Sequence, residues 1–233
     1  MIDGGEADSS IVQYLQSQGV QSLDLVVTTH PHSDHIGGLV AVLRTFPTVR
    51  VVTNGVMHTT APYENFHDAI AASQDEYIEV VRGNSLMLGS LTLDVLNPGR
   101  FVEGDLNRNS VVFRMAYGNT TFLFTGDANN DTEAEIITAG LPLSADILKV
   151  GHHGSSTSTG AAFLAAVHPA VALYMAGKEN SHGHPSTDTL AVLGGAGVNV
   201  LGTDVNEVLA YAHYTRPSFT VIKLCHILGI KTN

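Results

Sequence analysis

A short apolar run that ends in a cluster of histidines is the feature that most constrains how this chain can fold. Residues 23–29 read LDLVVTT, which is typical of a buried strand. The next six positions, HPHSDH, contain three histidines and one aspartate. Buried polar side chains need hydrogen-bond partners or a bound ion, so this cluster suits neither a core nor an ordinary surface. The sequence therefore predicts a strand whose end carries a site.

The rest of the chain alternates apolar runs with helical segments. Apolar periodicity predicts strands at 23–29, 49–53, 78–81, 85–88, 91–96, 110–117, 120–127, 145–151, 170–175 and 198–203. It predicts helices at 9–18, 37–46, 62–76, 131–139, 160–166 and 187–194. This order is typical of a layered α/β fold with mixed sheets, in which side chains at one set of strand ends converge.

The composition is that of one globular domain. The chain has 233 residues, 44% hydrophobic and 14% charged, and we expect a single domain over 1–233. Cys225 is the only cysteine, which excludes an intramolecular disulfide. No segment reaches the eighteen or so uninterrupted apolar residues of a membrane span, so we expect no membrane segment in this chain. The net charge of -11 disfavours contact with a long stretch of nucleic acid, which normally needs clustered lysine and arginine. The objection is weaker if some acidic residues bind divalent cations, because these reverse the charge locally at the site.

The first cluster has the spacing of a metal site. Alternate residues that leave a strand point the same way, so His30 and His32 can bind one ion together. Asp34 and His35 can then face a second ion nearby. Imidazole and carboxylate suit Zn²⁺, Mn²⁺ or Fe²⁺. The alternative is a surface loop that happens to be rich in histidine.

Asp127 follows the apolar strand TFLFT, where a carboxylate is costly unless it is paired or coordinated. We interpret it as a ligand that bridges two cations. The alternative is a turn aspartate that caps the helix beginning near Asn130.

His152 and His153 also follow an apolar strand, and they precede Gly154-Ser155. We expect one histidine to bind metal and the other to contact substrate. We favour His152 as the ligand, because it is the first residue able to leave the strand after Gly151, but the two roles can be exchanged. The alternative is a solvated loop.

The segment ENSHGHPS at 179–186 is a fourth polar strand end. It could hold a substrate oxyanion or protonate a leaving oxygen, and His184 is the candidate for that work. Ser186 is more simply interpreted as a helix cap. The remaining histidines have no comparable neighbours and are assigned no site role: His58, His67, His168, His213 and His226.

These motifs resemble a known family. TTHPHSDHIGG is similar to the H-x-H-x-D-H signature of the metallo-β-lactamase superfamily. FLFTGDA, LKVGHHGSS and ENSHGHPS resemble later motifs of the branch that holds the hydrolase-like domain of the competence protein ComEC and related stand-alone proteins. The resemblance implies a four-layer αββα sandwich with a dinuclear site at one edge of the sheets. By this resemblance, one metal has His30 and His32 as ligands. The other metal has Asp34, His35 and His152, and Asp127 bridges the two.

The chain also departs from the family pattern. Most members have a further histidine before the bridging aspartate, whereas this chain has LNRNSVV there, so Asn107, Asn109 or Ser110 would line the site instead. We expect the first strand or strands of the family to be missing, and the tail after Asp204 is atypical.

The resemblance implies metal-dependent hydrolysis with two divalent ions, zinc or manganese in preference to iron. A hydroxide activated by the metals would attack, with Asp34, Asp127 and His184 as catalytic residues. His153, Ser155, Asn109 and His184 would bind the substrate, and Lys149 is a further candidate to offset phosphoryl charge.

The leading hypothesis is a phosphodiesterase or nuclease, with single-stranded DNA as one candidate partner. The alternative is a lactonase, β-lactamase or other ester hydrolase. A redox diiron module or a silent binding domain is disfavoured, because His32 and the other motif residues are all present. The sequence does not indicate the oligomeric state or the cellular compartment.

Overall fold

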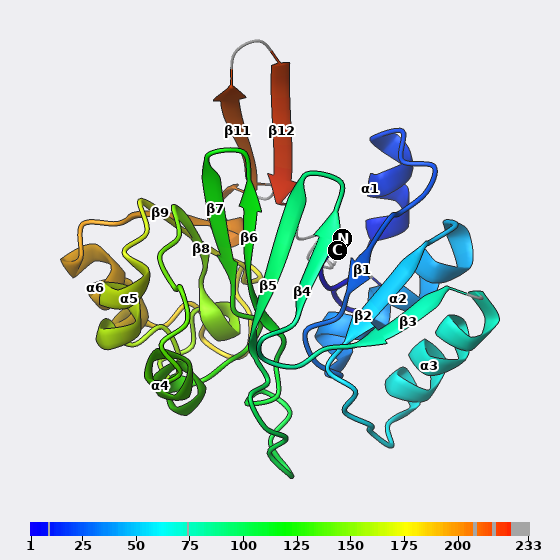
Figure 1. Ribbon diagram of the computed structural model, residues 1–233, viewed down its shortest axis with the longest axis horizontal. Coiled ribbons are helices and arrows are strands. Elements are labelled where there is room, and N and C mark those ends of the chain that lie inside the picture. The colour runs from blue at the N-terminus through cyan, green and yellow to red at the C-terminus, as the bar shows by residue number, and fades with distance from the viewer. Residues whose placement is uncertain (9, 74, 207–208, 216–217, 225–233) are drawn as a thin grey trace.

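Two β-sheets form the centre of the fold (Figure 1). The computed structural model describes residues 1–8, 10–73, 75–206, 209–215 and 218–224. The smaller sheet is parallel, with the order β1 (Val26–Val27), β2 (Arg50–Thr53), β3 (Glu76–Glu79). The larger sheet has the order β10-β9-β8-β7-β6-β5-β4. Its strands are β4 (Ser85–Leu88), β5 (Leu91–Asn97), β6 (Val112–Tyr117), β7 (Thr120–Phe124), β8 (Ile147–Lys149), β9 (Val171–Tyr174) and β10 (Asn199–Gly202).

The larger sheet is mixed. Strands β7 to β10 are parallel to one another, as expected of strands separated by helices, whereas β4 to β7 form an antiparallel meander. Gly118 has φ +56° and lies in the tight turn between β6 and β7, where the Gly118-Asn119 pair predicts a hairpin. The parallel half of the sheet therefore ends at a common edge.

Helices cover the outer faces of the two sheets (Figure 1). The helices on the side of the smaller sheet are α1 (Ile11–Ser17), α2 (Ser33–Thr45) and α3 (Ala61–Ser73). Those on the side of the larger sheet are α4 (Asn130–Thr138), α5 (Ala161–Val167) and α6 (Thr187–Gly195). A short 3-10 helix, η1 (Gly151–Gly154), follows β8, and α7 (Thr203–Asn206) follows β10.

The apolar side chains separate into layers. Val27 and Val52 pack between the sheets with Phe113, whereas their neighbours Val26 and Val51 face the helices. This alternation follows from the two-residue period of a strand. A third cluster joins the larger sheet to its helices and includes Leu123, Leu148, Ala172, Ile136, Phe163 and Leu193. The fold is therefore the predicted four-layer αββα sandwich, with one parallel and one mixed sheet.

Several boundaries differ from those expected from the sequence. Helix α2 begins at Ser33 instead of 37, so Asp34 and His35 lie in its first turn and not in a loop. Residues 151–154 form a tight turn with a left-handed backbone at His152 and His153, within the segment that the sequence predicts as a loop. These shifts matter because both segments carry predicted site residues.

The tail after Asp204 contains an antiparallel hairpin of β11 (Leu209–Thr215) and β12 (Ser218–Leu224), which forms a sheet of its own. His213 lies on β11, and Cys225 and His226 lie outside the described residues. Among the helices that the structure describes, none has both the length and the apolar character needed to cross a membrane.

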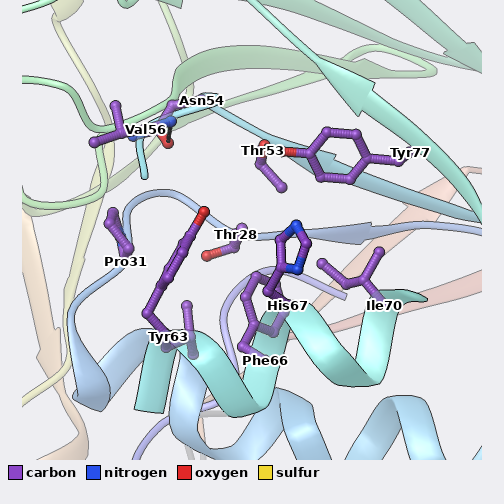
Figure 2. Close-up of a pocket in the computed structure, with 11 residues that line it drawn as sticks. Thr28, Pro31, Thr53, Asn54, Val56, Tyr63, Phe66, His67, Ile70 and Tyr77 are labelled. Carbon is purple, nitrogen blue, oxygen red and sulfur yellow. Dashed lines mark hydrogen bonds between the residues drawn. The ribbon is translucent and has the colours of Figure 1, made fainter. Parts of the chain in front are cut away.

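A small pocket lies between α3 and the smaller sheet (Figure 2). Tyr63 and His67 of α3 line it together with Thr28 and Tyr77, and its volume is about 10 Å³. That space holds at most one water molecule. His67 therefore belongs to this pocket wall and not to the histidine cluster.

Candidate metal centre

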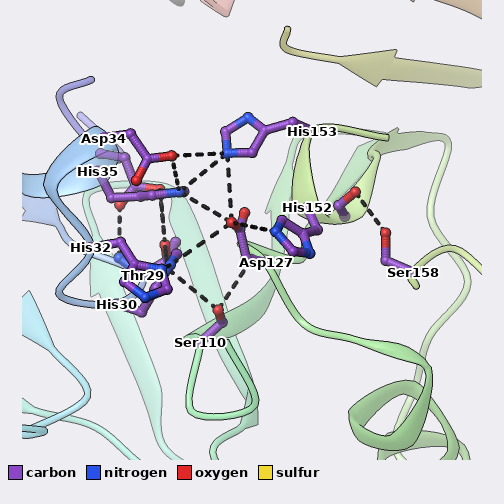
Figure 3. Close-up of polar contacts among 12 residues, drawn as sticks. Thr29, His30, His32, Asp34, His35, Ser110, Asp127, His152, His153 and Ser158 are labelled. Carbon is purple, nitrogen blue, oxygen red and sulfur yellow. Dashed lines mark hydrogen bonds and ion pairs between the residues drawn. The ribbon is translucent and has the colours of Figure 1, made fainter. Parts of the chain in front are cut away.

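Three chain segments bring polar side chains together at one edge of the sheets (Figure 3). The first runs from the end of β1 into α2, the second follows β7, and the third is the 3-10 turn after β8. The predicted site residues that meet here are His30, His32, Asp34, His35, Asp127, His152 and His153.

Asp127 is at the centre of the cluster. Its Oδ2 atom lies 3.4 Å from Nε2 of His35 and 3.5 Å from Nε2 of His153. The Nε2 atoms of His30 and His152 are each 3.8 Å away. Burial would raise the pKa of Asp127, but the neighbouring His35 and His153 outweigh it and hold the pKa well below its ordinary value. The side chain is therefore a carboxylate that four imidazoles surround.

The turn before Asp127 needs glycine. Gly126 has φ +52°, and a Cβ atom there would lie 2.9 Å from Cβ of Thr29 and 3.0 Å from Cβ of Ser110. The backbone N–H of Asp127 donates to Oγ of Ser110 over 3.1 Å. A close turn and one buried hydroxyl thus aim the carboxylate at the histidines.

His30 is fully buried and neutral. Burial, followed by the charge of His35, lowers the pKa of His30 to about 3. Its Nδ1 atom lies 3.1 Å from Oγ1 of Thr29, and its Nε2 atom is 2.8 Å from Nδ1 of His32. A neutral imidazole keeps a nitrogen lone pair, which is the form that binds a metal ion. The expected convergence of His30 and His32 is present.

Asp34, His35 and His153 form a second group of ligand-type atoms. Oδ2 of Asp34 lies 3.5 Å from Nε2 of His35 and 3.4 Å from Nε2 of His153. Nδ1 of His153 faces the carbonyl oxygen of Met175 over 2.8 Å, which fixes the ring. The Nε2 atoms of His35 and His153 approach to 3.3 Å. Both rings therefore present Nε2 to the same small space.

Asp3 orients His35, and the sequence interpretation did not identify it. Oδ2 of Asp3 lies 2.8 Å from Nδ1 of His35. Thr29 donates its backbone N–H and its hydroxyl to the same carboxylate over 2.8 and 2.9 Å. Burial would raise the pKa of Asp3, but His35 outweighs it and lowers that pKa. No local pattern indicates this role, because the pairing spans 32 residues.

The turn that carries His152 and His153 has an unusual backbone. The two residues have φ +44° and +54°, in the left-handed region that non-glycine residues rarely adopt. Gly151 holds the turn at its start: its N–H donates to Oγ1 of Thr159 over 3.1 Å, and its carbonyl accepts from Oγ of Ser158 over 2.8 Å. These buried hydrogen bonds stabilise a strained segment at the site.

The structure separates the three candidates for the position of the missing histidine. Ser110 lies in the cluster, with Oγ 3.5 Å from Nδ1 of His30. Asn109 lies outside the cluster, because its side-chain amide hydrogen-bonds to the backbone of Val102 and to the carbonyl oxygen of Asp105. Asn107 lines a neighbouring cleft. Asn109 lines the same cleft, so its expected substrate-binding role stays a prediction.

The other expected substrate-binding residues lie at different distances from the cluster. The ring of His184 is 5.7 Å from that of His152, centroid to centroid. Ser155 is buried, and its hydroxyl lies 3.0 Å from that of Thr157. The ammonium of Lys149 donates to the carbonyl oxygen of Val150 over 2.8 Å. Among these three residues, His184 is therefore the one whose side chain lies next to a ring of the cluster.

The donor atoms fit divalent cations. His30, His35 and Asp127 form one group, and Asp34, His35 and His153 form another, each with its ligand atoms within 4.8 Å of one another. Oδ1 of Asp127 is buried and has no hydrogen-bond partner among the described residues. A buried carboxylate oxygen without a donor is costly, and coordination would satisfy it.

The comparisons with known proteins agree with this fold. The profile of the Metallo-beta-lactamase superfamily matches residues 1–178. The chain therefore belongs to this superfamily of metal-dependent hydrolases.

Two curated relatives match most of the chain. The chain is 32% identical over 206 residues to ComE operon protein 3 of Bacillus subtilis (strain 168), which covers 88% of this chain and 26% of the relative. It is 30% identical over 209 residues to Competence protein ComA of Neisseria gonorrhoeae, which covers 88% and 27%. The chain thus spans about a quarter of the length of these relatives.

A solved structure shares the fold. The metallo-beta-lactamase fold protein YhfI from Bacillus subtilis aligns with a TM-score of 0.58 and 17% identity, over 86% of this chain and 82% of that one. At this identity the likeness concerns the fold alone.

Proposed function

We propose that this chain is a metal-dependent hydrolase that cleaves phosphodiester bonds with two divalent cations, manganese or zinc in preference to iron. The observation that carries the proposal is the position of Oδ2 of Asp127, within 3.4 to 3.8 Å of four imidazole nitrogens. A single carboxylate among that many imidazoles suits a site for two metal ions better than a purely structural network.

In this proposal the histidine and aspartate cluster would hold two ions, and Asp127 would be a ligand of both. His30 and His32 belong to the first ion, and Asp34 and His35 belong to the second. His153 is the better candidate for the remaining ligand of the second ion, because its Nε2 atom is 3.4 Å from Asp34. His152 then has the substrate-facing role, which exchanges the two roles favoured by the sequence.

Two bound cations would lower the pKa of a water molecule and offset negative charge on the substrate oxygens. The protein residues have separate tasks. Asp3 and the carbonyl oxygen of Met175 hold the rings of His35 and His153 in place. His184 adjoins His152, and burial followed by the charge of His152 lowers the pKa of His184. A largely neutral His184 could accept a hydrogen bond from substrate or, when protonated, donate a proton to the leaving oxygen.

The choice of a phosphodiester rests on a relative named for competence and on the site chemistry. That relative makes DNA a reasonable partner to test. The net charge of -11 argues against a long duplex footprint and in favour of a short or single-stranded substrate. The substrate proposed is therefore one phosphodiester in a short nucleotide or in single-stranded DNA.

A panel of substrates tests this proposal. The metal-free protein is loaded with Mn²⁺ or with Zn²⁺ and assayed on bis(p-nitrophenyl) phosphate, single-stranded DNA, a lactone and a cephalosporin. We expect hydrolysis of the phosphodiesters, and the loss of that hydrolysis when a chelator removes the ions. Turnover of the lactone or the cephalosporin without any phosphodiester cleavage would refute the proposal.

A further inference from the structure

A cleft of 590 Å³ borders the metal centre at His32. Besides His32, its walls come from two segments, 56–58 after β2 and 101–109 between β5 and β6, in which Asn109 is the last residue that lines the cleft. Neither segment contributes a member of the two donor groups. The cleft is therefore a separate space that opens beside the proposed reaction site.

Hydrogen bonds hold the walls of the cleft in place. Nδ2 of Asn54 donates to the carbonyl oxygen of Asn109 over 2.8 Å, which ties one wall to the other. The side chain of Asn109 accepts from N–H of Val102 over 2.9 Å and donates to the carbonyl oxygens of Val102 and Asp105 over 2.7 Å each. The cleft is thus preformed, which reduces the entropy that a ligand must overcome to bind.

The walls combine exposed apolar surface with negative charge. The side chains of Met57 and Phe101 are 83% and 64% exposed, although both are large and apolar. Glu103 and Asp105 also line the cleft, and its lining includes no lysine or arginine. Such a surface attracts a flat uncharged group and repels a second phosphate.

Asn107 adds a polar group to the same lining. Asn107 is half-buried, and an amide side chain can hydrogen-bond to the polar edge of a ring. Apolar stacking surface together with an amide is a combination that suits a nucleobase.

We propose that this cleft binds the uncharged base of a nucleotide whose phosphodiester lies at the metal centre. The inference rests on the proposed phosphodiesterase function and makes it more specific. The base would stack against Phe101 and Met57, and the acidic wall would exclude neighbouring phosphates. The preferred substrate is then a short nucleotide phosphodiester with one base in the cleft, and not a simple alkyl phosphodiester.

Two substrates with the same leaving group test the inference. Thymidine 5′-(p-nitrophenyl phosphate) and methyl p-nitrophenyl phosphate carry the same charge and differ in the base-bearing group. We expect kcat/KM to be about tenfold or more higher for the thymidine compound, which is the effect of stacking one base. Phe101→Ala should remove most of that preference.

Met87→Ala is the matched control, because Met87 on β4 is 67% exposed and does not line the cleft. It should leave the preference unchanged. Equal kcat/KM for the two substrates, or a preference that survives Phe101→Ala, would overturn the base cleft and leave the phosphodiesterase proposal intact.

If neither substrate is cleaved with Mn²⁺ or Zn²⁺, the phosphodiesterase function is refuted. A binding experiment then tests the base cleft separately. Saturation-transfer NMR with thymidine, which has no phosphate, reports on the cleft alone. Transfer to thymine protons in the parent protein, lost in Phe101→Ala and kept in Met87→Ala, would support the cleft. Absence of transfer, or equal transfer in all three proteins, would overturn it.

Discussion

Glu133 should make the stability of this protein depend on pH, through the loop that supports the histidine turn. Its carboxyl group is 2% exposed and accepts hydrogen bonds from the backbone N–H of Thr159 and, over 2.9 Å, of Gly160. Thr159 in turn accepts from the N–H of Gly151. The perturbation is Glu133→Gln, which has nearly the same shape and no titration.

Burial raises the pKa of Glu133 from 4.5 to about 7 and outweighs the two backbone hydrogen bonds, which lower it. The folded state therefore keeps a proton that the unfolded chain releases between these two pH values. The stability that this proton contributes is fully present below pH 4.5 and is lost as pH rises to about 7. At 1.36 kcal/mol per pKa unit, the loss amounts to about 3 kcal/mol.

The assay is chemical unfolding of the metal-free protein at several pH values, for the parent chain and for Glu133→Gln. Other groups titrate in the same range, but their effects cancel when one profile is subtracted from the other. We expect the difference in the free energy of unfolding between parent and variant to fall by about 3 kcal/mol from pH 4.5 to pH 7. A difference that is constant with pH, or that increases, would show that the carboxyl is already ionised in the folded state.

Three further substitutions test the local geometry. Gly37→Ala would place a Cβ atom 2.5 Å from the backbone nitrogen of Ala7. Chemical denaturation should show that the free energy of unfolding falls by about 1–3 kcal/mol. The control is Gly194→Ala, which should not be destabilising because an added Cβ there has nothing within 4 Å. Ser110→Ala leaves a buried N–H without its acceptor and should cost about 1–3 kcal/mol in the same assay, so an unchanged stability would contradict that contact. Asp3→Asn should weaken metal binding about 10–100-fold in a competition titration with a chelator, whereas Asp24→Asn, at an exposed position, should leave affinity unchanged.

Much of the site could be predicted because strand ends converge in a layered α/β fold. The residues of HPHSDH, Asp127 and the pair at 152–153 each follow an apolar run, and the structure brings them within a few ångströms of one another. The pattern is informative because a charged or imidazole side chain directly after a buried strand is costly unless it is paired or binds an ion.

The features that the sequence did not determine depend on long-range contacts or on backbone angles. Asp3 is a single carboxylate near the start of the sequence, and nothing local indicates that it meets His35. The choice between His152 and His153 depends on two left-handed residues, which no periodicity predicts. The amide of Asn109 donates to the carbonyl oxygens of Val102 and Asp105, and no local pattern indicates these contacts.

Metal content in Asp127→Asn tests the central claim most directly. The substitution keeps the shape of the side chain and removes the charge that four imidazoles surround. The measurement is the number of Mn²⁺ or Zn²⁺ ions bound per chain, by elemental analysis after loading and desalting, with Asp68→Asn on the exposed face of α3 as control. We predict two ions for the parent chain and for the control, and at most one for Asp127→Asn, together with loss of bis(p-nitrophenyl) phosphate hydrolysis. Two ions and full activity in Asp127→Asn would contradict a bridging role for this carboxylate.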